Sequence, residues 1–333
     1  MDTDWLTLLC AAALAFSVMN YVVLDGTDLG VGMLMGLTAC SKQRRVMAVS
    51  ILPVWDANET WLVLGGGGLL ALFPLAYAIL LPALYVPFIV MFLALIARAM
   101  ALEFRDYAAN EQRKRIVDGV LALASLLTGF VQGVVLGTLV QGVAHQGGQY
   151  IGDGRDWLSP FPVFCGLVLV LGYVWLGTCW LYWRTLDELQ RRSARQARVL
   201  SLVVVALLLV LIAWTATLQP QYARRLAEIR LWLPAGVILC ALGWVFSKGF
   251  HSRFDFIPLF AALGVFVLAF AVMLVALFPF IIPPDLTLSQ AASSPNSQIF
   301  MLIGFAVLIP VTLAYNTFGF RVFSGKVRVA NDD

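Results

Sequence analysis

The sequence predicts an all-α integral membrane protein with nine transmembrane helices. Its 333 residues are 61% hydrophobic and only 12% charged, and the mean hydropathy is +0.88, well outside the range of soluble domains. A spanning helix needs about 20 mostly apolar residues, because each residue rises about 1.5 Å across a hydrocarbon core of about 30 Å. Nine apolar runs meet this length: 5–37, 47–73, 75–102, 116–140, 160–183, 198–218, 231–249, 257–281 and 299–323.

The positive charges between these runs predict the orientation of the chain. Of the 22 Lys and Arg residues, only four fall in the loops after the second, fourth, sixth and eighth runs: Arg155, Arg224, Arg225 and Arg230. Cytoplasmic loops carry the excess of positive charge in membrane proteins. We therefore expect a multi-pass protein of the bacterial inner membrane, with its N-terminus outside and its C-terminus inside. The small net charge of +3 does not suggest a nucleic-acid partner.

The loop after the fourth run divides the predicted helices into four and five. Residues 141–160 are rich in glycine and polar side chains, which is typical of a connection between packed units. We therefore expect two domains, an N-terminal four-helix bundle at 1–150 that holds the intramembrane acids, and a C-terminal bundle with the ninth helix at 151–333.

Cofactor ligands are scarce in this sequence. The five cysteines are scattered through apolar segments without a CxxC or CxxCH pattern, and the two histidines, His145 and His251, fall in loops. A haem held by two histidines inside the membrane is therefore excluded, although methionine ligation is not. We predict no metal site and no catalytic residue in this chain.

Intramembrane acids form the clearest functional pattern. Asp25 and Asp28 lie three residues apart in the first predicted helix, and Asp56 and Glu59 lie three apart in the second, so each pair shares one helix face. A charged residue inside the membrane costs roughly 2.5 to 3.5 kcal/mol on insertion scales, which implies a polar interior or a partner. Glu103, at the end of the third run, is expected near the cytoplasmic mouth.

Carboxylates at successive depths are what a proton relay requires, because each group must accept and release a proton without stranding charge. We therefore interpret the five acids as a proton path, with Thr27, Trp55 and Asn58 shaping it. The alternative is a structural hydrogen-bond cluster with no role in proton transfer.

Several blocks spread over nearly the whole chain resemble subunit II of the cytochrome bd family. They are residues 24–32, 53–61 and 98–105, and near the end 278–288, 300–302 and 323–326. The resemblance implies two four-helix bundles plus a ninth helix. It also implies a larger partner, subunit I, which carries two b haems and one d haem.

The complexes of this family oxidise quinol and reduce dioxygen to water with protons from the cytoplasm. The resemblance implies that this subunit supplies no haem ligand, supports its partner, and contributes acids to the proton path. Asp25, Asp28, Asp56 and Glu103 match the motif positions. A small single-helix subunit accompanies some members. Some members also bind a structural quinone in this subunit, but no residue pattern here marks such a site.

Two positions depart from the family pattern. Ala57 stands where the family commonly has glycine, and Thr27 stands where it often has an aromatic residue. These departures are compatible with the cyanide-insensitive branch of the family.

Two other functions stay open at this point. Secondary transporters also place acids near the middle of the membrane, often at broken helices in two repeated halves. A purely structural scaffold is the third interpretation, in which the acids are paired and inert.

Overall fold

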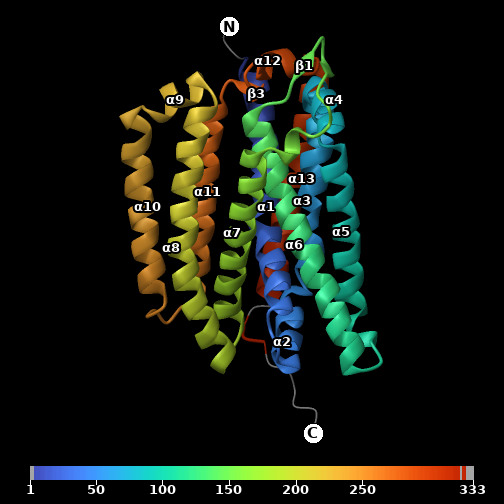
Figure 1. Ribbon diagram of the computed structural model, residues 1–333, viewed down its shortest axis with the longest axis vertical. Helices are drawn as coiled ribbons and strands as arrows, with labels where there is room; N and C mark the ends of the chain where they lie inside the picture. The colour runs from blue at the N-terminus through green and yellow to red at the C-terminus, as the bar shows by residue number, and fades with distance from the viewer. Residues whose placement is uncertain (1–3, 323–324, 328–333) are drawn as a thin grey trace.

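Long helices lie side by side along one axis of the molecule (Figure 1). The structure, a computed structural model, describes residues 4–322 and 325–327. Within these ranges, eight helices are long and apolar enough to cross a membrane, and the bent pair α3 and α4 would make a ninth span. The chain is therefore a multi-pass membrane protein. Its elements are α1 (Trp5–Gly36), α2 (Ser41–Ile51), α3 (Trp55–Leu72), α4 (Pro74–Ala83), α5 (Tyr85–Phe104), η1 (Arg105–Tyr107), α6 (Glu111–Gln141), β1 (His145–Gln146), β2 (Gln149–Tyr150), η2 (Asp156–Leu158), α7 (Pro160–Arg184), α8 (Asp187–Leu218), α9 (Pro220–Leu226), α10 (Ile229–Gly249), α11 (Ile257–Leu277), β3 (Phe280–Ile282), β4 (Leu286–Thr287), α12 (Leu288–Ala291) and α13 (Pro295–Val322).

Two of the predicted spans are divided in the structure. The run 47–73 contains the end of α2, a break at residues 52–54 and then α3, while the run 75–102 contains α4 and α5. The bend between α3 and α4 is 120°. Pro53 lies in the first break and Pro74 opens α4. Proline lacks the backbone N–H that continues a helix, so the polypeptide turns at these points although its hydropathy is continuous.

Helix α1 lies in the interior of the helical array and contacts α3, α6, α7 and α13. Its closest approach to α7 lies at Gly30, in the last third of α1. A Cβ atom on Gly30 would lie 1.8 Å from the carbonyl oxygen of Tyr173, and a Cβ atom on Gly177 would lie 2.5 Å from the carbonyl carbon of Gly30. Only glycine fits at this crossing, because the two backbones touch. The contact holds the segment of α1 that carries Asp25 and Asp28 at the centre of the molecule.

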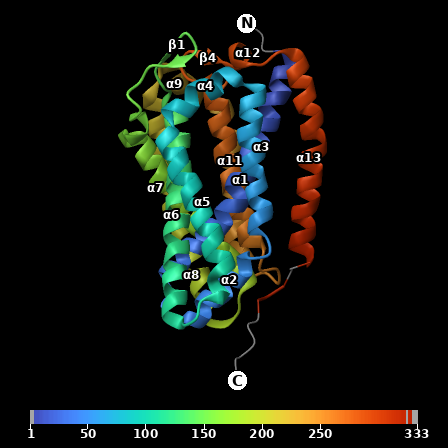
Figure 2. The same ribbon diagram turned by 90° about the vertical axis from the view of Figure 1, so that its right-hand side faces the viewer.

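The last helix returns to the first part of the chain. Figure 2 shows α13 running beside α1 and α3, and α13 contacts both of these helices. Phe305 of α13 is 3% exposed and packs in one apolar core with Cys10 of α1 and Leu72 of α3. Helix α13 therefore closes an apolar core between the first part of α1 and the end of α3.

Both β-hairpins and the short helix α12 lie at the end of the molecule where α1 begins (Figure 1). Strands β1 and β2 form an antiparallel hairpin inside the 141–160 loop, and β3 and β4 form a second one. Ile282 and Ala291 of this end are buried against Cys10 and Ile79. Helix α7, which follows the 141–160 loop, packs on α1 and α6. The division into domains at 1–150 and 151–333 stays a prediction.

Candidate functional site

A buried arginine on α5 joins acids from two other helices. Arg98 is 2% exposed. Its Nη1 donates to Oδ1 of Asp25 on α1 at 2.6 Å, and its Nη2 donates to Oε1 of Glu59 on α3 at 2.7 Å. Asp25 is fully buried, whereas the Glu59 side chain is 26% exposed. One guanidinium therefore holds two carboxylates in place, as its planar array of donors allows.

A second acid lies one turn farther along α1. Asp28 is 2% exposed, and its Oδ2 accepts a hydrogen bond from Nδ2 of Asn58 on α3 at 2.7 Å. Asn58 accepts in turn from Nδ2 of Asn316 on α13, at 3.5 Å from its Oδ1. Helices α1, α3 and α13 are thus linked by one polar chain across their contact.

The two remaining path-shaping residues take different positions. The Trp55 ring lies 5.9 Å from the guanidinium carbon of Arg98, within the range of a cation–π contact. Thr27 is buried, but its hydroxyl donates to the carbonyl oxygen of Val23 on its own helix at 3.0 Å. Thr27 therefore packs beside the acids without joining them to one another.

Asp56 and Glu103 lie apart from this buried group. Both side chains are exposed on the chain as it stands alone, Asp56 in the first turn of α3 and Glu103 in the last turn of α5. Neither makes a hydrogen bond or an ion pair with another residue of the described ranges. Of the five predicted acids, the structure therefore brings Asp25, Asp28 and Glu59 together and leaves two at the surface.

The buried group around Arg98 contains more carboxyl groups than guanidinium groups. Arg98 binds two carboxyl groups, on Asp25 and Glu59, and a third carboxyl, on Asp28, lies one turn along α1 from Asp25. Asp25 Oδ2, Arg98 Nε and Asn316 Oδ1 are buried without a hydrogen-bond partner among the described residues. Unpaired charge in a region of low polarity is costly, and proton uptake by a carboxyl relieves it. The arrangement can therefore bind and release protons.

The comparisons with known proteins agree with one another. A family model described as "Cytochrome bd terminal oxidase subunit II" matches residues 6–323. The chain belongs to this family. The resemblance noted in the sequence is thereby confirmed, and the chain is one subunit of an oxidoreductase complex of this kind, with a subunit I as its partner.

The sequences of several relatives align with this chain over nearly its whole length. It is 30% identical over 317 residues to "Cytochrome bd ubiquinol oxidase subunit 2" of Bacillus subtilis, covering 92% of this chain and 93% of the relative. It is 27% identical to "Cytochrome bd-I ubiquinol oxidase subunit 2" of Escherichia coli K12, covering 93% and 92%. The solved structure of bd oxidase from Geobacillus thermodenitrificans includes a similar chain, with a TM-score of 0.78, 16% identity, and coverage of 96% of this chain and 99% of that one. The last likeness shows a shared fold.

A haem is expected in the complex of this cytochrome bd subunit II, and the chain itself offers two histidines as candidate ligands. His145 lies in β1 and His251 in the turn after α10, so both lie outside the long helices. They do not form a pair of axial ligands in the helical core.

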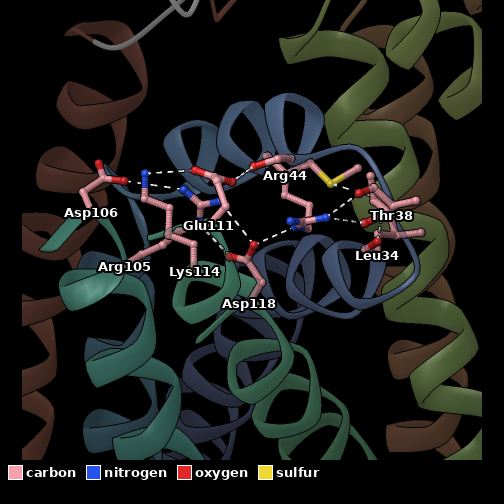
Figure 3. Close-up of polar contacts among 11 residues, drawn as sticks. Leu34, Thr38, Arg44, Arg105, Asp106, Glu111, Lys114 and Asp118 are labelled. Atoms are coloured by element: carbon pink, nitrogen blue, oxygen red, sulfur yellow. Dashed lines mark hydrogen bonds and ion pairs between the residues drawn. The ribbon is translucent and has the colours of Figure 1, made fainter. Parts of the chain in front are cut away.

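A second buried ionic cluster lies at the end of the molecule that carries α2 (Figure 3). Asp118 of α6 is 2% exposed and accepts from two arginines. Arg44 Nε lies 2.7 Å from its Oδ2 and Arg105 Nε lies 2.6 Å from its Oδ1. Arg44 Nη1 also donates to the backbone carbonyls of Thr38 and Ala39 at 3.0 and 2.6 Å. This cluster fastens the α1–α2 connection to the start of α6.

Sequence reasoning missed the central arginine of the site. Arg98 falls in the predicted run 75–102, yet we counted its charge with those of the cytoplasmic side. In the structure it lies inside α5, with Ala94, Leu95 and Ala101 buried around it. Its apolar neighbours on both sides were the signal that it belongs to a helix. Asn316 and Asp118 also stand inside apolar runs, and the same signal applies to them.

Proposed function

We propose that this chain is the haem-free second subunit of a cytochrome bd-type quinol oxidase in the bacterial inner membrane. The complex would oxidise quinol and reduce dioxygen to water, with two b haems and one d haem in subunit I. The observation that carries the proposal is the buried Arg98, Asp25 and Glu59 group inside a chain of this family. Two four-helix bundles plus α13, with the N-terminus outside and the C-terminus inside, belong to the same proposal.

The proton path begins, in this proposal, at Glu103 near the cytoplasm and continues through the buried acids Asp25, Asp28 and Glu59 to Asp56. The exposed position of Asp56 supports a place for it in the path between the buried acids and subunit I. A carboxylate in a spanning segment is rarely left against lipid, because desolvation is costly. Asp56 is therefore expected to face a polar contact in the complete complex, where it can pass protons towards the partner's oxygen site.

The surface of α3 supports contact with subunit I at this place. Asp56, Thr60, Val63, Gly67 and Leu70 recur at spacings of three and four residues and are all exposed. Residues at these spacings share one helix face. A Cβ atom on Gly67 would meet nothing within 4 Å, so a helix of another subunit can approach the backbone closely here.

Replacement of Asp56 by Asn is expected to slow quinol oxidation by at least about tenfold, because an amide cannot relay a proton. The haem spectra of the complex should stay unchanged, since Asp56 contacts no haem in this proposal. Oxygen consumption and charge translocation of the complex in vesicles measure the effect. Asp285→Asn is the matched control, since Asp285 is an exposed acid in the connection between β3 and β4. Undiminished oxygen consumption and charge translocation in Asp56→Asn would remove Asp56 from the path without affecting family membership.

A further inference from the structure

Three polar side chains from three helices form a hydrogen-bonded array beside Asp25. The hydroxyl of Tyr173 on α7 donates to Oε1 of Gln132 on α6 at 2.6 Å. Nε2 of Gln132 donates to the hydroxyl oxygen of Tyr21 on α1 at 2.8 Å. Tyr173 is fully buried and Tyr21 is 5% exposed. None of the three residues belongs to the acid motifs of the family resemblance.

The direction of these bonds leaves one hydrogen free. The amide of Gln132 receives from Tyr173 and gives to Tyr21, so the Tyr21 oxygen already acts as an acceptor. Tyrosine carries one hydroxyl proton. The hydroxyl hydrogen of Tyr21 therefore takes part in no hydrogen bond of the array and is available to another acceptor.

The matching acceptor lies one helical turn away. Asp25 follows Tyr21 by four residues, so the two side chains share a face of α1. Oδ1 of Asp25 accepts from Arg98, whereas Oδ2 is buried without a hydrogen-bond partner in the described part of the chain. An unsatisfied buried carboxylate oxygen is costly. One free donor and one free acceptor thus face the same site.

The tyrosine that starts the array is rigidly held. A Cβ atom on Gly26 would lie 2.3 Å from Cε1 of Tyr173, and a Cβ atom on Gly129 would lie 3.0 Å from its Cδ2. The ring also stacks on Phe266, with centroids 6.2 Å apart and planes inclined by 12°. Glycines of α1 and α6 therefore form a slot that fixes the Tyr173 hydroxyl, and with it the orientation of Gln132 and Tyr21.

We infer that Tyr21 is a positioning residue whose hydroxyl donates a hydrogen bond to Oδ2 of Asp25. Gln132 and Tyr173 hold the Tyr21 hydroxyl in that orientation. The inference rests on the proposed role of Asp25 in the proton path. A hydrogen bond to the ionised form of a carboxyl favours that form. Tyr21 therefore sets the pH range in which Asp25 is ready to accept a proton. The titratable and charged groups that face Asp25 are Tyr21 and Asp28 of α1, Glu59 of α3, Arg98 of α5 and Tyr173 of α7.

The test is the pH dependence of quinol oxidation by the purified complex that contains Tyr21→Phe. The phenyl ring keeps the packing and removes only the donor. We expect the pH of half-maximal turnover on the acidic side to rise by roughly one unit, with the haem spectra unchanged. Gln132→Leu should move it in the same direction by less, because Tyr21 keeps its proton but loses its fixed orientation.

Tyr150→Phe provides the matched control. The hydroxyl of Tyr150 in β2 also donates to a carboxylate, that of Asp156 in η2, at 2.7 Å. This bond lies outside the long helices, so its removal should leave the pH profile unchanged. A Tyr21→Phe profile that coincides with the unmodified one overturns the inference. If the Tyr21 variant does not assemble, an unshifted profile in Gln132→Leu overturns the inference instead.

Asp25→Asn separates the two proposals. Full turnover in that variant removes Asp25 from the path. Slow turnover in Asp25→Asn with an unshifted Tyr21→Phe profile overturns only the role of Tyr21.

Discussion

Replacement of Arg98 by Gln is expected to lower quinol oxidation by more than tenfold and to reduce the amount of assembled complex. The variant removes the guanidinium that binds Asp25 and Glu59, whose oxygens lie 2.6 and 2.7 Å from it. Removal of one partner of a buried ion pair leaves an uncompensated charge and typically costs about 3 to 5 kcal/mol. Turnover per haem and the yield of complex in mild detergent measure the two effects separately.

Arg98→Lys tests the geometry of the same site. Lysine keeps the positive charge but presents a compact ammonium that does not match two carboxylates as the guanidinium does. We therefore expect assembly to recover more than turnover. Arg115→Gln is the control, because Arg115 is an exposed arginine in the first turns of α6. Normal yield and normal turnover in Arg98→Gln would show that the buried group neither stabilises the chain nor serves the reaction.

Replacement of Asp118 by Leu has the second large expected effect, which is on stability. Two arginines, Arg44 and Arg105, would remain buried at 5% and 3% exposure without their shared carboxylate. The cost is again about 3 to 5 kcal/mol, and it falls on the contact between the α1–α2 connection and α6. We expect a lower midpoint in thermal unfolding of the purified complex and a lower yield.

Asp106→Asn is the matched control for Asp118. Its side chain is 63% exposed and lies 3.5 Å from the same Arg105. Exposed ion pairs contribute about 0 to 1 kcal/mol, so this variant should unfold at nearly the unmodified temperature. Equal thermal midpoints for the Asp118 and Asp106 variants would mean that the buried cluster contributes no more than a surface pair.

Hydropathy predicted the helical membrane fold because that property is local to each segment. The run 160–183 coincides with α7 to within one residue, and the run 5–37 with α1. The breaks inside the runs 47–73 and 75–102, at residues 52–54 and at Leu84, were missed because the apolar composition continues through them. In the run 198–218, the helix was recognised but its start was not. Helix α8 begins at Asp187, since a charged segment can continue a helix beyond the apolar part.

The sequence predicted the acidic residues of the candidate site but not most of the residues that bind them. The spacing within α1 and within α3 placed Asp25, Asp28 and Glu59 on helix faces, and the structure joins Asp25 and Glu59 through Arg98 and Asp28 to Asn58. Contacts between distant segments are not encoded in a local pattern. Asn316 meets Asn58 only because α13 returns to α3, and Gln132 meets Tyr21 only because α6 packs on α1.

The most direct test of the proposed function is an optical difference spectrum of the tagged chain, purified gently from its native membrane, together with a gel of the proteins that accompany it. The account predicts absorption bands of haem b and haem d and a larger subunit in stoichiometric amount. A colourless chain that purifies alone would contradict the account and would favour a transporter that uses the same buried carboxylates.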